Sequence, residues 1–189
     1  MITKGSFPSL AVPSHELRLR LGTTELSSEM QQWIQQTQNA ANCRYCYTRL
    51  PVEIPQDGTV RIGDWSIPSV SLCKNLSGCR EAFLFVVTIG TEIDRLIARL
   101  AVASPAQQFV TDAAASALAE GGADAVSALL GDHRSCRPRF SPGFGDFTLA
   151  YQPELLRLTD AGRQIGVTVT DTLFLTPTKS VTAIMGVQA

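Results

Sequence analysis

Arg139 and Glu120 are the residues whose types and settings best fit ligand binding. Arg139 begins the segment RFSPGFGDF (139–147), in which an arginine and aromatic residues surround a Pro142-Gly143 turn. A guanidinium pairs with a carboxylate through two parallel hydrogen bonds, and a glycine turn exposes backbone groups to a ligand. The pattern indicates either a loop that folds back onto the core or a loop that holds a flat, charged ligand.

Glu120 lies in the small-residue stretch DAAASALAEGGADA (112–125). A carboxylate beside alanine and glycine is sterically open to a cation. By helical spacing its face also carries Asp124, one turn further along, which we expect to matter less. A solvated helix residue remains the alternative interpretation of Glu120. Together, Glu120 and Arg139 suggest a site for a zwitterion.

The motifs of several common enzyme classes are absent from the sequence. No G-x-S-x-G elbow accompanies the two histidines, His15 and His133, which stand in polar, solvent-like settings. There is no G-x-G-x-x-G after a predicted strand and no G-x-x-x-x-G-K-[ST]. The sequence therefore disfavours a Ser/His/Asp mechanism and the usual dinucleotide and phosphate loops, and we expect no catalytic acid or base.

The cysteines allow a metal site but do not favour one. There are five, at 43, 46, 73, 79 and 136. An odd number argues against a disulfide framework, and Cys43-x-x-Cys46 with the Cys73/Cys79 pair could be metal ligands. However, the segment CRYCYTRL (43–50) is typical of a strand, in which residues three apart point to opposite faces. We therefore expect buried thiols and no metal.

Composition indicates one ordinary globular domain spanning residues 1–189. The chain has 44% hydrophobic and 17% charged residues and a net charge of −1. No lysine or arginine run exceeds two residues, so nucleic acid is not an expected partner. The N-terminus lacks a signal-peptide pattern, and the longest apolar run, Ala82–Ile89, is too short for a membrane span. We expect a cytoplasmic protein with no membrane partner.

Six helices are predicted from periodicity and end signals. They cover residues 14–20, 28–41, 68–77, 91–101, 104–130 and 153–161. The expected start signals are a Ser28/Gln31 capping box, Pro68, the pair Thr91/Asp94, and Ser104-Pro105. Gly121-Gly122 lowers the stability of the longest helix by about 1 kcal/mol per glycine. We therefore expect a close packing contact there.

Five strands are predicted, at residues 43–49, 59–62, 81–90, 166–175 and 180–187. The segment EAFLFVVTIG (81–90) is apolar enough to be buried on both faces. Helices and strands alternate without a regular βαβ rhythm. The sequence therefore predicts an α+β fold in a single domain.

Much of the chain resembles the activation domain of vitamin B12-dependent methionine synthase, and more closely its freestanding version. The segments RFSPGFGDF, LAYQPELLRL and IGVTVTDTLFLTPTKSVTAI resemble an R-x-x-P-G-[YF] loop followed by the family's last strands. Upstream, LSGCREAFLFVVTIGTEIDRLI, DAAASALAE and HELRLRLG resemble further family segments. The resemblance implies a mostly antiparallel sheet with long helices.

The resemblance also implies a function in methionine biosynthesis. Cobalamin enzymes of this family cycle through cob(I)alamin, which is occasionally oxidised to inactive cob(II)alamin. The activation domain binds S-adenosylmethionine and presents its methyl group to the cobalt of a partner while a flavodoxin- or ferredoxin-type protein supplies an electron. The expected partner is a cobalamin-binding methionine synthase or another corrinoid protein. Such a subunit supports reductive reactivation only by orienting the methyl group of S-adenosylmethionine towards the cobalt.

Five residues are implied as ligand contacts by this resemblance. Arg139 matches a contact to the ligand's carboxylate, Glu120 a carboxylate near its positive end, and Pro142, Gly143 and Phe144 the adenosine or methionine part.

The sequence departs from the family pattern in three places. Phe144 replaces the commoner tyrosine, and Asp132 stands where the family has a better aligned acid. The sequence ends at Ala189, before further family tyrosines, so we expect a partner to complete the pocket.

Two other functions fit the sequence. A docking or assembly module for a corrinoid methyltransferase, with weak or no binding of S-adenosylmethionine, is favoured by the missing acid and tyrosines. A cysteine-ligated metal or electron-transfer protein is suggested by the cysteine spacing, and it would be coloured or contain stoichiometric metal.

Overall fold

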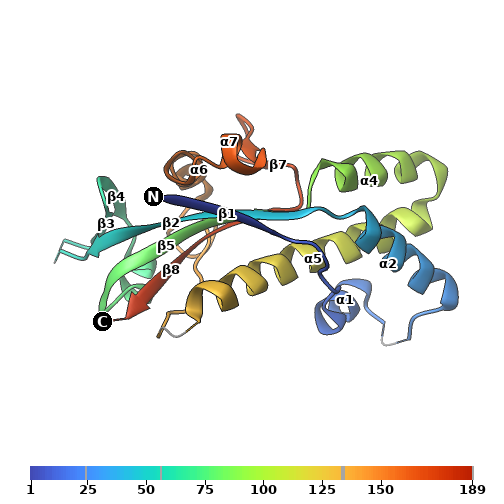
Figure 1. The fold of residues 1–189 in the computed structure, drawn as a ribbon, viewed down its shortest axis with the longest axis horizontal. Coiled ribbons are helices and arrows are strands. Elements are labelled where there is room, and N and C mark those ends of the chain that lie inside the picture. Colours follow the sequence, from blue (N-terminus) through green and yellow to red (C-terminus); the bar gives the residue numbers. More distant parts are fainter. Residues whose placement is uncertain (24, 56, 133–134, 189) are drawn as a thin grey trace.

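The fold is built on an antiparallel sheet (Figure 1). A computed structural model describes residues 1–23, 25–55, 57–132 and 135–188. In this part of the chain, the sheet order is β4-β3-β2-β5-β8, with β1 paired to β2. Every neighbouring pair is antiparallel. The strands are β1 (Ile2–Phe7), β2 (Cys43–Glu53), β3 (Thr59–Ile62), β4 (Trp65–Pro68), β5 (Cys79–Thr88) and β8 (Ser180–Gln188). The prediction of an α+β fold with a mostly antiparallel sheet is confirmed.

Strand β5 is the centre of the sheet, as its apolar sequence predicts. It lies between β2 and β8, and its side chains alternate between two cores. Leu84 and Val86 face one core, whereas Phe83, Phe85 and Val87 face the other. A strand that is buried on both faces needs no polar alternation, which explains its continuous apolar run.

Helices cover both faces of the sheet (Figure 1). The long helix α5 (Pro105–Gly131) lies on one face, and α6 (Gln152–Thr159) with α7 (Ala161–Ile165) lies on the other. Helices α1 (Ser14–Leu21), α2 (Ser28–Ala40) and α4 (Thr91–Ala103) pack against α5, and α3 (Val70–Asn75) follows β4. None of the described helices is long and apolar enough to cross a membrane.

The glycine pair of α5 lies at a close contact, as expected. A Cβ atom on Gly121 would lie 2.8 Å from Cγ of Pro13, and one on Gly122 would lie 3.1 Å from Sγ of Cys43. The helix begins where predicted, because the Ser104 hydroxyl accepts a hydrogen bond from the Gln107 amide at 3.4 Å. These contacts fix α5, and therefore Glu120, against the sheet.

The predicted Ser28/Gln31 capping box is wrong by one residue. Ser27 is the N-cap of α2, and its hydroxyl accepts from the Met30 amide at 3.1 Å. The Gln31 side chain instead donates to the Leu26 carbonyl at 3.1 Å. Two adjacent serines offer the same capping chemistry, and packing selects between them.

Two other predicted helix starts are also corrected. Pro68 is the last residue of β4, and the hydroxyl of Ser69 caps α3. The N-cap of α4 is Gly90, not Thr91. Asp94 does not serve as a cap residue, because it accepts hydrogen bonds from Thr178 in the connection before β8.

The segment predicted as a long strand at 166–175 forms a small hairpin instead. Its strands are β6 (Thr168–Val169) and β7 (Leu175–Thr176), and the Thr170 amide donates to the Phe174 carbonyl at 2.9 Å. Leu173 has a positive φ of 66°, which breaks the strand. Strand β1 was not predicted, because its mostly exposed residues show no apolar alternation.

Candidate functional site

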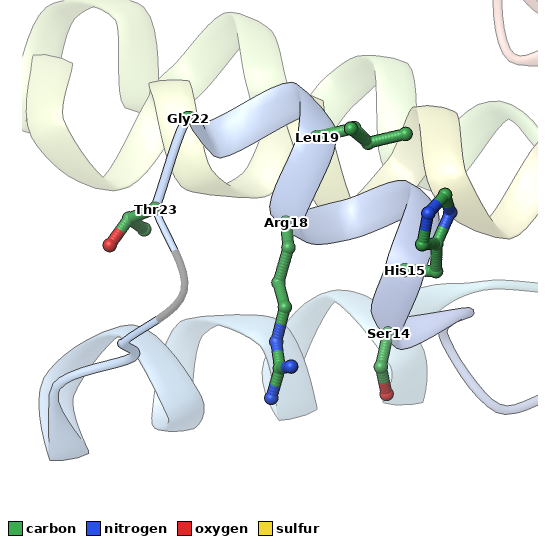
Figure 2. A pocket seen from close by; sticks show the side chains of 6 residues that line it. All are labelled: Ser14, His15, Arg18, Leu19, Gly22 and Thr23. Carbon is green, nitrogen blue, oxygen red and sulfur yellow. The ribbon is translucent and has the colours of Figure 1, made fainter.

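A wide hollow of about 850 Å³ beside α1 does not have the character of a specific site. Its lining residues come from α1 and the turn that follows, and Figure 2 shows that their side chains diverge. Ser14 and Arg18 point one way, whereas His15 and Leu19 point away from them. A binding site needs polar groups that converge on one ligand. His133, the second histidine of the sequence, lies outside the described residues.

A second hollow, of about 430 Å³, brings together four of the five expected contact residues. It lies between α5, the loop 139–144, the hairpin β6–β7 and β8. Gly143 shapes the loop but is not part of the lining. The pocket is lined by Glu120, Arg139, Ser141, Pro142, Phe144, Gln152, Leu175, Ser180, Val181 and Thr182.

The segment that carries Arg139 is held along the outer edge of β8. The Phe140 amide donates to the Ile184 carbonyl at 2.8 Å, and the Ile184 amide donates back at 2.9 Å. Three residues before Phe140, the Arg137 amide donates to the Gly186 carbonyl at 2.8 Å. Arg139 therefore projects from backbone that the sheet positions, not from a free loop.

The turn at 141–147 closes on itself through backbone hydrogen bonds. The Phe144 amide donates to the Ser141 carbonyl at 3.2 Å, and the Gly143 amide donates to the Phe147 carbonyl at 2.6 Å. Gly143 has φ of +102°, a conformation that side chains disfavour. This requirement explains why residue 143 is a glycine.

The two phenylalanines of the turn have different environments. Phe147 has no exposed surface and stacks on Tyr151 with ring centroids 5.4 Å apart. It also contacts the rings of Trp65 and Phe140. Phe144 is 59% exposed at the pocket. The loop therefore folds back onto the core and also presents an aromatic surface.

Asp146 attaches the far end of the turn to α3. The Ser69 hydroxyl donates to its carboxylate at 2.6 Å, and the amides of Val70 and Ser71 donate at 2.7 and 3.1 Å. The Ser69 hydroxyl foremost, and then these amides, hold the pKa of Asp146 below its ordinary value despite the opposing effect of burial. The turn is thus attached at both ends.

Opposite charges meet at one side of the pocket, where Glu120 and Arg139 belong to its lining. Arg139 donates from Nη2 to Oε2 of Glu120 at 2.8 Å, and from Nη1 to Oδ1 of Asp124. Burial lowers the pKa of Arg139, but the hydrogen bond and charge of Asp124, followed by those of Glu120, outweigh it and raise that pKa. Asp124, which we expect to matter less than Glu120 for ligand binding, also contacts Arg139 directly.

Lys179 holds the start of β8, whose residues 180–182 line the pocket, against α5. Its ammonium lies 2.8 Å from Oδ1 of Asp112 and donates to the Ser116 hydroxyl at 2.9 Å. The preceding residue, Thr178, is held by Asp94 of α4 at 2.9 Å. These contacts tie the start of β8 to two helices.

Gln152 and Thr182 are pocket residues that sequence analysis did not select. Gln152 is buried, and its amide donates to the Leu173 carbonyl at 2.7 Å. Its side-chain oxygen accepts from the Thr182 hydroxyl at 3.1 Å. Thr182 could have been selected from the sequence, because it is a polar residue at an inward-facing position of a buried strand.

The geometry predicted for Cys43 and Cys46 is confirmed. Cys43 packs in the core on the α5 face of the sheet, and Cys46 packs in the core on the α6 face. Burial raises the pKa of Cys43 to about 11 and that of Cys46 to about 12. Among the described residues, no group of three or more His, Cys, Asp or Glu side chains could hold a metal ion.

We expect Cys43 and Cys46 to resist alkylation in the native protein. The rise in pKa lowers the thiolate fraction at pH 8 by about a hundredfold for Cys43 and about a thousandfold for Cys46, and burial excludes the reagent. Because the folded-state pKa values are raised, their contribution to stability is present below pH 9 and is lost as the pH rises towards 11 for Cys43 and towards 12 for Cys46. Mass spectrometry of alkylated peptides, native against unfolded, measures the effect. Equal labelling of both states would contradict it.

Comparison with known proteins identifies the fold. No protein-family model and no curated protein matches the sequence. Among solved structures, the chain is similar to the crystal structure of the MetH reactivation domain bound to AdoHcy, with a TM-score of 0.69 and 14% sequence identity. The similarity covers 98% of this chain and 78% of that chain. The chain therefore has the fold of the MetH reactivation domain, as its sequence motifs suggested.

Proposed function

We propose that this chain binds S-adenosylmethionine and presents the methyl group to a cobalamin-bearing partner, as a reactivation subunit of a methionine synthase or related corrinoid protein. The observation that carries the proposal is the pairing of Glu120 with Arg139 in one pocket, on a fold whose solved relative was crystallised with AdoHcy.

The dimensions and polarity of the pocket fit such a ligand. Its volume of about 430 Å³ lies within the range of about 300–1,000 Å³ that is usual for small-molecule sites. The ligand carries a carboxylate, an ammonium and a sulfonium, and Arg139 and Glu120 offer the opposite charges. Phe144 offers an exposed ring at the same pocket. These features support the proposal independently of the fold.

The protein residues would act by binding and orientation. Arg139 would hold the carboxylate, Glu120 would face the positive end, and the backbone of the turn at Pro142-Gly143 would align the rest. S-adenosylmethionine supplies the methyl group, and one electron from a flavodoxin- or ferredoxin-type donor makes the partner's cobalt able to accept it. Holding two reactants in line is sufficient for a large acceleration, and no acid or base is required.

An exposed apolar rim beside the pocket supports a protein partner. Phe144, Leu149 and Phe174 are 59%, 38% and 67% exposed. Phe144 lines the pocket, and Phe174 is next in sequence to the lining residue Leu175. Leu149 lies against Gly143, because a Cβ atom placed on that glycine would contact the Leu149 side chain. Exposed apolar side chains on the pocket loop and on neighbouring segments are consistent with an interaction surface.

Reconstitution tests the proposed function. We expect no methyl transfer from S-adenosylmethionine by the chain alone, and transfer when a cobalamin protein held as cob(II)alamin and a reductant are both added. The partner and reductant without the chain are the control. Efficient methylation of a small acceptor without cobalamin would contradict the proposal.

The docking module remains the second candidate, because Arg139 is already paired with two carboxylates of its own chain. Calorimetric titration separates the two functions. A docking module binds the corrinoid protein but releases no heat with S-adenosylmethionine, alone or in the complex.

A further inference from the structure

Arg139 is held by two carboxylates that occupy different positions. Glu120 and Asp124 lie four residues apart on α5, and each binds a different terminal nitrogen of the guanidinium. Both terminal nitrogens of Arg139 therefore have protein partners before any ligand is present.

The two acids differ in their relation to the pocket. Glu120 lines the pocket and its side chain is 40% exposed, whereas Asp124 is outside the lining and its side chain is 66% exposed. A well solvated carboxylate loses little when it exchanges an ion pair for water. Asp124 is therefore the partner that Arg139 can release at the lower cost.

The Arg139 side chain is only 25% exposed, so an unpaired guanidinium would be costly there. A ligand carboxylate that takes the place of Asp124 at Nη1 leaves the Glu120 ion pair at Nη2 intact. Glu120 then keeps its position in the pocket lining, where it can face the positive end of the ligand.

On the basis of the proposed function, we propose that Asp124 is an internal competitor of the ligand's carboxylate. It occupies Arg139 in the empty site, keeps the guanidinium in position, and gives way when a carboxylate-bearing ligand enters. Asp124 thereby lowers the affinity of the site for S-adenosylmethionine and makes that affinity depend on the ligand's carboxylate.

The test compares two ligands on the full-length chain. Asp124→Asn and Asp124→Ala are titrated with S-adenosylmethionine and with its decarboxylated analogue, which lacks the competing group. We expect both variants to bind S-adenosylmethionine about two- to fivefold more tightly, the equivalent of one exposed ion pair. Affinity for the decarboxylated analogue should not change.

Glu92→Gln is the matched control, because Glu92 is an ion-paired, exposed acid on α4 and its substitution makes the same change in net charge. Weaker binding of S-adenosylmethionine by the Asp124 variants would show that Asp124 holds the ligand's ammonium, and would overturn the inference. An equal gain for both ligands would also overturn it, because a net-charge effect would explain the result. If the wild-type chain binds neither ligand, the proposed function fails and the inference fails with it.

Discussion

Phe147→Ala is expected to lower the free energy of unfolding by about 3–5 kcal/mol, the usual cost of removing a fully buried phenylalanine ring. Phe147 has no exposed surface, and its ring contacts Trp65, Phe140 and Tyr151. The surrounding rings belong to several elements and cannot easily fill the cavity. Since small domains are stable by about 5–15 kcal/mol, the loss is a large fraction of the total. Denaturant unfolding measures it.

Phe144→Ala is the matched control, three residues away in the same turn. Phe144 is 59% exposed, so its removal should change the free energy of unfolding by about 0.5 kcal/mol or less. We expect this variant to weaken ligand binding without unfolding the protein. Equal loss of stability in both variants would contradict the division of the turn into a core residue, Phe147, and an exposed pocket residue, Phe144.

Arg139→Ala is expected to weaken binding of S-adenosylmethionine by about ten- to a hundredfold. The loss of a charge-assisted hydrogen bond costs about 1.5–3 kcal/mol, which corresponds to that change in affinity. The side chain is 25% exposed and projects from backbone held by β8, so the fold should persist. Calorimetric titration gives the affinity, and thermal unfolding checks the fold.

Glu120→Gln should weaken binding by a similar factor while keeping the helix and the side-chain volume. Arg157→Ala provides the control, because Arg157 is an exposed arginine of α6 whose ion-pair partner, Glu154, lies on the same helix. Wild-type affinity in both the Arg139 and Glu120 variants would refute the proposed site and favour the docking module.

The long elements of the fold were predictable because local signals and packing agree. Local sequence and tertiary packing favour the same structure at three places: the Ser104-Pro105 helix start, the small residues around Gly121-Gly122, and the apolar run of β5. The helix starts at Ser28, Pro68 and Thr91 were misplaced for a different reason. At Thr91/Asp94, for example, the acid's partner is Thr178, 84 residues away, and no local pattern reveals such a contact.

The candidate site likewise depends on tertiary contacts that local sequence does not reveal. Spacing alone could not show that Glu120 and Arg139, nineteen residues apart, would share a pocket. The family resemblance supplied that expectation, and the turn chemistry of Pro142-Gly143 agreed with it. Gln152 and Lys179 were missed, and the contact of Asp124 with Arg139 was not predicted, because each is defined by a tertiary partner and not by its neighbours in the chain.

The attachment of the segment 135–140 to β8 has a consequence for solubility. β8 ends the strand order of the sheet, so its outer backbone groups would otherwise be open to pairing with another chain. The carbonyls of Ile184 and Gly186 and the amides of Ile184 and Gln188 are instead bonded to this segment. The stretch that carries Arg139 thus also shields an aggregation-prone edge. If the turn binds the ligand as we propose, natural variation in this region must satisfy both demands, and the turn is less free to diverge than an ordinary surface loop.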